Sequence, residues 1–593
     1  MAVMSAPDRG PGLRRNPTGI QRYLPFTDWL FHYQRQDLPG DLMAGLIVAI
    51  MLVPQGMAYA LLAGLPPQIG LYASIFPLFV YGLLGSSRVL AVGPVAIVSL
   101  LVAAGVSTLA GGDVAAYVQI ALTLALLVGI IQVGMGLLRV GFLVNFLSHP
   151  VLVGFTAAAA IIIGFSQLKH VLGYNVPRFE HFYAQVLYTV QHLHEANWLA
   201  LLIGVGSILI LYFFKSRLPG LLKRTGVNPN LIVPISKSGP LLIVIFGVAL
   251  TQLLQLHERF GLNIVADVPA GLPPLTVPTI DMNLWIALLP IALTISFVGY
   301  MESVSVAKSL ASKRRQKIDA NQELVALGAA NLGATFTGGY PVTGGFSRSV
   351  VNYDAGANTG MASIVTGALI LLTVLFLTPL FYYLPKAVLA AIILIAVVNL
   401  IDVAAFKHIW AYNKADAAAL IITFFAVLIF GIERGILVGA AAAIISFVWR
   451  SSKPHMAVVG RIGKTDKYRN VLRYNVQTWP EVLTIRVDES LFFANTKYLE
   501  DIVLGMVADQ PDVKYMILLG TAINFIDASA LETLESLNDE LKSAGVELHL
   551  AAMKGPVLDQ LRKIGFVDEL GPDRVHFSNH DAQIGRASCR ERV

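Results

Sequence analysis

The stretch Thr337-Gly-Gly-Tyr-Pro-Val-Thr-Gly-Gly-Phe-Ser-Arg348 lies between hydrophobic segments and decides how the chain folds. It contains four glycines, one proline, two threonines, a serine and an arginine. In lipid, backbone that leaves the helical conformation must bury its N–H and C=O groups in protein or line a wet cavity. A broken helix also directs the positive end of its dipole into the protein, and Arg348 adds a full positive charge there. The stretch therefore predicts an anion-binding site within a membrane transporter.

The composition is that of a membrane protein. Of 593 residues, 55% are apolar and 13% are charged, and the mean hydropathy is +0.67. The charged share is about half the usual one. The net charge of +6 does not indicate a nucleic-acid partner, because no basic patch is interleaved with exposed aromatic residues. We therefore expect a lipid bilayer around the chain and interpret its basic residues as topology signals.

We predict fourteen hydrophobic segments that cross or enter the membrane. They cover residues 42–62, 67–84, 94–110, 116–138, 142–168, 197–214, 238–256, 284–307, 321–336, 345–356, 359–383, 387–402, 415–431 and 434–449. Fourteen divides into two sevens, and an odd number of helices in each half inverts one half relative to the other. Gly93-Pro94-Val95 opens the third segment, and Tyr340-Pro341-Val342 precedes the tenth, which is the third of the second half. Such paired interruptions point to a transporter's binding site.

The positions of basic residues predict that both chain ends are cytoplasmic. Loops after even-numbered segments carry Arg88, Arg139, Lys215, Arg217, Lys223, Arg224, Lys308, Lys313, Arg314, Arg315, Lys317, Lys407 and Lys414. Loops after odd-numbered segments are nearly bare or mix signs, as with Arg178 and Glu180. This is the charge bias of cytoplasmic loops. Residues 1–41 contain no signal peptide and are expected to form a cytoplasmic N-terminal segment.

The composition changes after the last hydrophobic segment. We predict a transmembrane domain over 42–450, a polar linker over 451–480 and a small cytoplasmic α/β domain over 481–583. Strands are expected near 482–488, 513–519 and 547–552, and helices near 495–507, 529–543 and 555–564.

The last ten residues, 584–593, look like the translation of a sequencing-adapter oligonucleotide. We expect them to be a non-native tail, the alternative being a natural basic tail. They hold the single cysteine, Cys589. The native part would then have no cysteine, which excludes a disulfide framework or a thiolate metal site.

Several long motifs occur together in this chain. They are Val53–Tyr72, beginning Val-Pro-Gln-Gly-Met-Ala-Tyr-Ala; Glu302-Ser-Val-Ser-Val-Ala-Lys-Ser-Leu-Ala311; and Gly338–Asn352, ending Phe-Ser-Arg-Ser-Val-Val-Asn. With them the chain resembles the SulP sulfate-permease family, which includes plant sulfate transporters and the animal anion exchangers related to prestin. The soluble module resembles a STAS domain, with Phe525-Ile-Asp-Ala-Ser-Ala-Leu531 as its signature turn. The resemblance implies fourteen segments in a core half and a gate half, an anion held between the third and tenth helix ends, and a homodimer.

Arg348 is the residue we expect to neutralise the bound anion. Backbone N–H groups around Phe346 and Ser347 at one end, and Val95 and Ala96 at the other, would complete the site. The alternatives are an internal ion pair, or an arginine that snorkels to the surface. Ionisable residues inside a membrane are functional by default, and the resemblance supports the anion site.

Gln55 and Tyr59 are four residues apart and share one face of the first segment. The resemblance places this helix beside the substrate, where Gln55 could donate to an oxyanion without adding charge. For Tyr59, ordinary packing with a satisfied hydroxyl is an equal alternative. Ser99 and Thr343 could add hydroxyl donors, as could Ser347, but such residues also hydrogen-bond within membrane helices.

Glu302 is the only acidic residue that we place clearly inside a mid-chain segment. An unpaired carboxylate in a low dielectric favours its protonated form. A protonated Glu302 would let a dianion bind beside Arg348 without a second buried negative charge, which predicts proton-coupled symport. The alternative is a permanent Glu302–Arg348 salt bridge that joins two helices.

Ser529 begins a helix in the STAS signature and is a regulatory candidate. The equivalent serine is phosphorylated in related soluble STAS proteins, and a phosphate at a helix N-terminus is electrostatically favourable. The alternative is that Ser529 is a helix N-cap.

The leading hypothesis is a secondary active transporter in the cell inner (plasma) membrane that takes up sulfate with a co-transported proton. Sodium-coupled bicarbonate transport or proton-coupled dicarboxylate transport is the alternative within this class. An uncoupled anion exchanger or channel, and a membrane scaffold that presents its STAS domain to a cytosolic partner, are the other classes. No nucleotide loop, metal cluster or catalytic triad is evident, so we expect no cofactor, no metal site and no enzyme activity.

Overall fold

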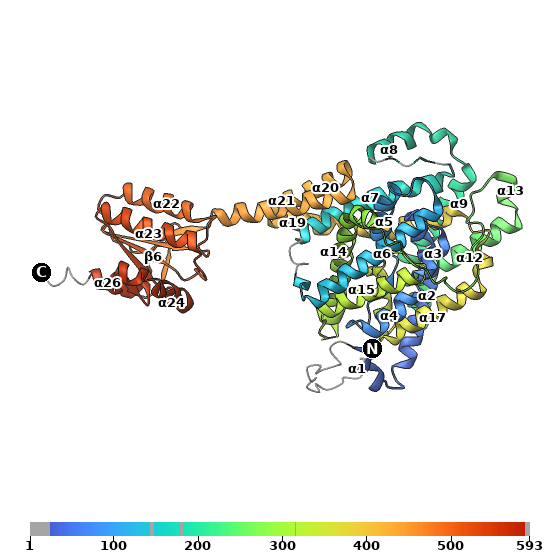
Figure 1. The fold of residues 1–593 in the computed structure, drawn as a ribbon, viewed down its shortest axis with the longest axis horizontal. Coiled ribbons are helices and arrows are strands. Elements are labelled where there is room, and N and C mark those ends of the chain that lie inside the picture. Colours follow the sequence, from blue (N-terminus) through green and yellow to red (C-terminus); the bar gives the residue numbers. More distant parts are fainter. Residues whose placement is uncertain are drawn as a thin grey trace. The chain divides into compact units, whose positions relative to one another are not determined.

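The computed structural model describes residues 24–142, 148–174, 176–177, 179, 182–314, 316–463 and 465–587. Arg178, Glu180, Arg315 and Cys589 lie outside the described residues, as do the first 23 residues of the predicted N-terminal segment. The chain divides into two compact units, a helical unit over Met1–Ala443 and a soluble unit over Ile444–Val593 (Figure 1).

The helical unit has the architecture of a polytopic membrane protein. Its helices are α1 (Phe26–Phe31), α2 (Leu38–Leu62), α3 (Pro67–Tyr72), α4 (Phe76–Leu84), α5 (Ala96–Ser107), α6 (Val114–Leu137), α7 (His149–Leu172), α8 (Phe182–Gln191), α9 (Trp198–Ser216), α10 (Leu218–Arg224), α11 (Pro229–Lys237), α12 (Gly239–Leu253), α13 (Leu256–Phe260), α14 (Met282–Lys313), α15 (Ala320–Phe336), α16 (Phe346–Asp354), α17 (Met361–Phe376), α18 (Lys386–Val397), α19 (Val403–Tyr412) and α20 (Lys414–Phe430), followed by α21 (Ile432–Ser452). Every predicted segment coincides with at least one of these helices, which is consistent with two inverted repeats of seven.

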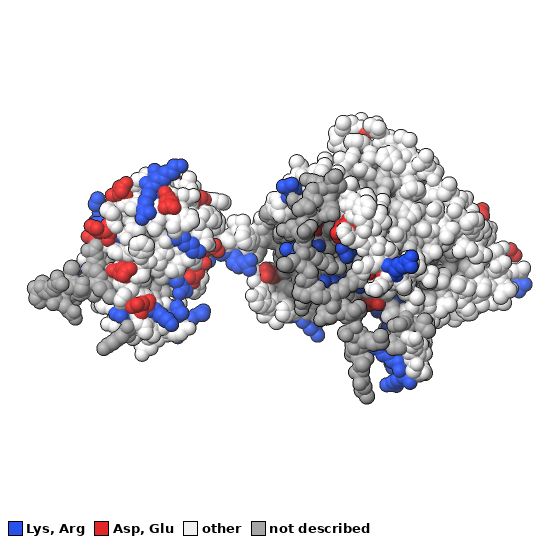
Figure 2. Space-filling model, turned by 90° about the horizontal axis from the view of Figure 1, so that it is seen from below, with Lys and Arg blue, Asp and Glu red and all other residues white. Residues whose placement is uncertain are grey.

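Length and composition agree with membrane insertion. Among the described residues, eight helical stretches are long and apolar enough to cross a bilayer. Figure 2 shows broad uncharged areas on the helical unit, whereas the soluble unit carries charges of both signs. Two segments differ from expectation. The second is split into α3 and α4, with Pro77 at the start of α4, and the fifth begins at His149, where Pro150 stands in the first turn of α7.

A short, completely buried antiparallel sheet of two strands lies within the helical unit. Strand β1 (Val92–Gly93) pairs with β2 (Thr343–Gly344), and the partners are Val92 with Gly344 and Gly93 with Thr343. Gly93 has a φ of +148°, which favours glycine. Each strand leads directly into a short helix, α5 or α16. Because the strands are antiparallel, the two helices begin beside each other and extend in opposite directions, as inverted repeats predict.

The soluble unit is an α/β domain built on a six-stranded sheet. The strands are β3 (Met456–Arg461), β4 (Tyr468–Asn470), β5 (Val482–Val487), β6 (Tyr515–Leu519), β7 (Glu547–Ala551) and β8 (Val575–His576), in the order β4-β3-β5-β6-β7-β8. The helices are α22 (Thr496–Ala508), α23 (Ala528–Ser543), α24 (Gly555–Lys563), α25 (Phe566–Leu570) and α26 (Asn579–Ala587). The predicted strands and helices of this domain are all present.

The prediction of a linker over 451–480 is wrong, because this region supplies two strands. Strand β3 pairs antiparallel with β5, and β4 pairs with β3. The inward residues Ala457 and Val459 pack against Ile517 and Leu519 in a second small core. The basic residues between these short strands hid the alternation of buried and exposed positions.

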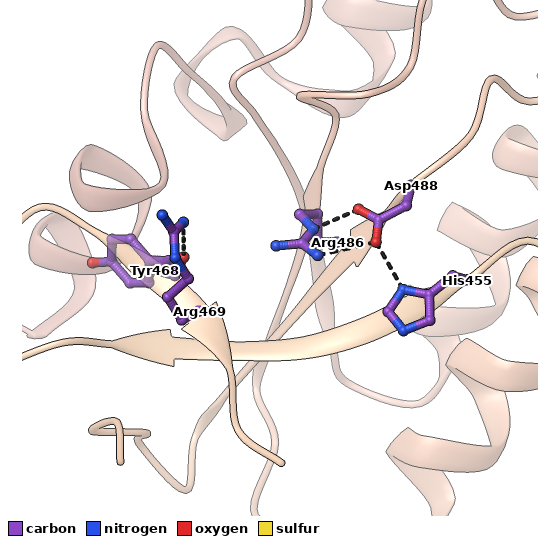
Figure 3. A network of polar contacts seen from close by, with 5 residues as sticks. All are labelled: His455, Tyr468, Arg469, Arg486 and Asp488. Atoms are coloured by element: carbon purple, nitrogen blue, oxygen red, sulfur yellow. Dashed lines mark hydrogen bonds and ion pairs between the residues drawn. The ribbon is translucent and has the colours of Figure 1, made fainter. Parts of the chain in front are cut away.

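A polar network joins the ends of β3 and β5 (Figure 3). Arg486 donates from Nε to Asp488 Oδ1 at 2.5 Å and from Nη2 to Oδ2 at 3.0 Å. His455 Nδ1 lies 2.7 Å from the same Oδ2. The hydrogen bonds from Arg486 lower the pKa of the Asp488 carboxyl, and the bonds to Asp488 raise the pKa of Arg486. The network therefore joins β3 to β5.

Candidate anion-binding site

The Arg348 guanidinium lies where the starts of α5 and α16 meet. The side chain is 3% exposed, and its Nη1 donates to the carbonyl oxygen of Pro94 at 2.7 Å. Two glycines leave room for it. A Cβ on Gly345 would lie 2.9 Å from Nη2, and a Cβ on Gly93 would lie 3.4 Å from the same atom. Arg348 therefore bridges the two interrupted segments that the sequence pairs.

Unpaired donors surround this position. Among the described residues, Nε and Nη2 of Arg348 are buried and have no hydrogen-bond partner. The N-cap residues of the two helices, Val95 and Gly345, provide no side-chain cap. The first N–H groups of both helices are thus left for another acceptor. Buried donors without acceptors are costly in free energy, and two helix N-termini with a guanidinium favour an anion.

The four predicted backbone positions have different surroundings. Val95 and Ala96 are buried, whereas Phe346 and Ser347 are exposed at the start of α16. The structure therefore has a closed side at α5 and an open side at α16. Their role in binding remains a prediction.

The rest of the broken segment is held by neighbouring helices. Asn331 of α15 accepts the N–H of Val342 at 2.8 Å and donates to the Val342 carbonyl at 3.1 Å. Thr343 Oγ1 lies 2.7 Å from the Gly299 carbonyl and 2.7 Å from Ser303 Oγ, both on α14. The Thr343 hydroxyl therefore binds protein, and it is not available as the anion donor that we considered.

Tyr340 is a residue that sequence reasoning missed. It is completely buried, and its hydroxyl lies 2.8 Å from Ser99 Oγ on α5. This hydrogen bond joins the two repeats, and it gives a protein partner to the Ser99 hydroxyl that we considered as an anion donor. The position of Tyr340 inside the glycine-rich stretch was the signal that could have identified it.

Glu302 lies on α14 and makes no ion pair with Arg348 among the described side chains. Its Oε2 is buried without a hydrogen-bond partner, although the two charges are close enough to interact electrostatically. A permanent salt bridge, the alternative interpretation, is not what the structure contains. The Glu302 carboxyl therefore lies within electrostatic range of Arg348 but is not paired with it.

Glu323 corrects the prediction that Glu302 alone is acidic within a mid-chain segment. It is completely buried in the first turn of α15 and accepts hydrogen bonds from the Tyr81 hydroxyl, the Ser86 hydroxyl and N–H, and the Ser87 N–H, at 2.7–2.9 Å. Sequence reasoning missed it because its partners, on α4 and on the loop that follows this helix, are distant in sequence. A fully hydrogen-bonded carboxylate has a structural role, which sets Glu323 apart from Glu302.

Gln55 and Tyr59 lie on α2, which packs against both α5 and α16. They are 7% and 6% exposed. The Gln55 side chain makes no hydrogen bond to any described residue, and Tyr59 interacts electrostatically with Arg348 and Glu302. Tyr59 is therefore near the site, and Gln55 lies one turn before it on the same helix. The contact of both residues with substrate remains a prediction.

Ser529 in the soluble unit is exposed at the second residue of α23. The N-cap of this helix is Asp527, whose Oδ1 accepts the Ala530 N–H at 2.8 Å. The alternative that Ser529 is the N-cap is therefore wrong. Among the described residues there is no group of three or more side chains that could hold a metal ion.

Comparisons with known proteins cover most of the chain. Residues 38–423 match the model described as the sulfate permease family, and residues 473–582 match the STAS domain. The probable sulfate transporter 4.2 of Arabidopsis thaliana is 37% identical over 575 residues, 95% of this chain and 83% of that protein. The chloroplastic sulfate transporter 4.1 of the same plant is 36% identical over 577 residues, which are 95% of this chain and 82% of that protein. The structure of SLC26A9 matches with a TM-score of 0.88 at 26% identity, over 97% of this chain and 94% of that one.

Proposed function

The chain belongs to the sulfate permease family, and we propose that it is a secondary active transporter that takes up sulfate together with protons. The names of its plant relatives support sulfate as the anion. The observation that carries the proposal is the buried Arg348 guanidinium, which lies between two helix N-termini with Nε and Nη2 unpaired. Sulfate has four oxygens that can accept from the guanidinium and from backbone N–H groups together.

Glu302 is the proposed proton carrier. A dianion beside Arg348 would be repelled by an ionised Glu302, because the interaction between charges is strong in a low dielectric. Protonation of Glu302 removes this repulsion, so a proton and sulfate each favour the binding of the other. By thermodynamic linkage the two effects are equal in size.

We also propose the setting in which this transport takes place. The basic loops support an orientation with both termini in the cytoplasm, and we place the protein in the cell inner membrane. The resemblance to prestin-related exchangers supports a homodimer, and an exposed Ser529 supports regulation through a cytosolic partner of the STAS domain.

Uptake of radiolabelled sulfate into proteoliposomes tests the proposal, with proton and sodium gradients imposed separately. We expect accumulation under an inward proton gradient only, and we expect Glu302→Gln to lose this dependence. Bicarbonate or dicarboxylate uptake without sulfate uptake would overturn the substrate. Uptake that does not depend on either gradient would indicate an exchanger. Unitary currents would indicate a channel. Equal sulfate binding by wild type and Arg348→Ala would favour a scaffold.

A further inference from the structure

Ser303 follows Glu302 directly in α14, and its hydroxyl joins this helix to the broken segment. Ser303 Oγ accepts the N–H of Gly344 at 2.8 Å and lies 2.7 Å from Thr343 Oγ1. Both hydroxyls lie 2.7 Å from the carbonyl oxygen of Gly299. Strand β2 is therefore fastened to α14 by one cluster of hydrogen bonds.

The cluster is tightly enclosed. Ser303 is 0% exposed and Thr343 is 1% exposed. Gly299 permits the approach, since a Cβ there would lie 2.9 Å from Thr343 Oγ1. Loss of the Ser303 hydroxyl would leave the buried Gly344 N–H without its acceptor, which weakens the attachment of β2 to α14.

The two charged groups of the proposed mechanism are close in sequence to the two elements that this cluster joins. Glu302 precedes Ser303 on α14, and Arg348 lies four residues after Gly344 on α16. Among the described residues, Arg348 of α16 and Tyr59 of α2 are the charged or titratable groups that interact electrostatically with Glu302. No ion pair joins Glu302 to Arg348 among the described residues, so the scaffold must set their separation.

We infer that Ser303 is a positioning residue that holds the proton site at Glu302 and the anion site at Arg348 at a fixed separation. The inference rests on the proposed proton–sulfate coupling. Electrostatic coupling falls with distance and with entry of water. A loosened β2 therefore weakens the coupling, although Glu302 and Arg348 are both still present.

The test measures the sulfate Kd of the purified full-length protein at pH 6 and pH 8 by calorimetry. Sulfate remains a dianion at both values, so the ratio of the two Kd values reports proton–sulfate coupling. We expect tighter binding at pH 6 in the wild type, so the Kd at pH 8 divided by the Kd at pH 6 should exceed one. In Ser303→Ala this ratio should be at least threefold smaller than in the wild type. Thr343→Val, which removes the other hydroxyl of the cluster, should act in the same direction.

Ser296→Ala is the matched control, because Ser296 is a completely buried serine of α14 whose Oγ has no partner among the described residues. Its ratio should equal that of the wild type. An unchanged ratio in folded, sulfate-binding Ser303→Ala and Thr343→Val overturns the inference and leaves the proposed function intact. If the ratio decreases equally in Ser296→Ala, the inference is also overturned, because the loss of any buried hydroxyl from α14 would then have the same effect. A ratio of one in the wild type instead refutes the proposed coupling itself, and the inference with it.

Discussion

At the scale of single residues, environment separates side chains that look alike in the sequence. Glu302 and Glu323 are both carboxylates within hydrophobic segments. Glu323 accepts hydrogen bonds from hydroxyl and N–H donors on α4 and the loop after it, whereas Glu302 Oε2 has no partner among the described residues. Glu302 is therefore the carboxylate that we propose as the proton carrier.

Arg348 should dominate the affinity for sulfate. Arg348→Ala removes charge-assisted hydrogen bonds worth roughly 1.5–3 kcal/mol each, so we expect at least a tenfold rise in the sulfate Kd. Arg348→Lys should recover only part of the affinity, because an ammonium lacks the planar fork of donors. Calorimetric titration with sulfate measures both. Arg217→Ala, which removes an exposed arginine, is the control, and an unchanged Kd in Arg348→Ala would contradict the site.

Asp488 should make the soluble unit sensitive to acid. Arg486 lowers the pKa of the Asp488 carboxyl in the folded state. The interaction therefore stabilises the folded state fully at a pH above the ordinary carboxyl pKa of about 4. This stabilisation is lost as the pH falls through the lowered pKa. Arg486→Gln should therefore lower the free energy of unfolding of the soluble unit at pH 7. The difference in this free energy between the variant and the wild type should become smaller toward pH 3.

Urea unfolding of a fragment over residues 453–587 measures this pH dependence. Lys497→Gln is the control, because its ion pairs with Glu500 and Asp501 involve an exposed lysine. A stability difference for Arg486→Gln that stays constant or widens at low pH would show that the Asp488 network does not titrate as inferred.

At the scale of elements, glycine decides how closely helices approach. A Cβ on Gly70 of α3 would lie 1.9 Å from the carbonyl oxygen of Gly56 on α2, and backbone atoms cannot move aside cheaply. This close contact supports α2, which carries two of the predicted substrate-binding residues. Small residues permit such packing between membrane helices.

Gly70→Ala should therefore destabilise the helical unit. We expect a lower Tm and a larger aggregated fraction in detergent, measured by fluorescence-detected size exclusion after heating. Gly134→Ala on α6 is the matched control, since no atom lies within 4 Å of its added Cβ. That variant should be neutral or slightly stabilising, because alanine favours helix more than glycine does. Equal Tm values for both variants would contradict the packing argument.

The short helices α5 and α16 illustrate how far an element can be predicted. Glycine and proline identified both interruptions, because these residues break helices in any context. The antiparallel pairing of β1 with β2 depends on two segments about 250 residues apart in sequence. The strands β3 and β4 were missed because their stability depends on pairing with distant or neighbouring strands, β3 with β5 and β4 with β3.

At the scale of the whole molecule, the soluble unit has its own sheet and its own core. We expect residues 453–587 to fold alone and to unfold cooperatively. A fragment that begins at residue 481 lacks β3 and β4, which exposes β5 as an apolar edge strand. That shorter fragment should aggregate, as measured by light scattering and size exclusion, whereas a monodisperse and equally stable short fragment would contradict the role of the two strands.

The sequence by itself determined the membrane class, the fourteen hydrophobic segments, the α/β domain and the identity of Arg348 and Glu302 as site candidates. These follow from composition, local pattern and the cost of polar groups in lipid, which are properties of short stretches of chain. The tertiary structure alone decided that Arg348 bridges two helix starts, that Thr343 and Ser99 bind protein, and that Ser303 fastens α14 to β2. Those facts depend on distances between segments that are remote in sequence, and no local pattern encodes such distances.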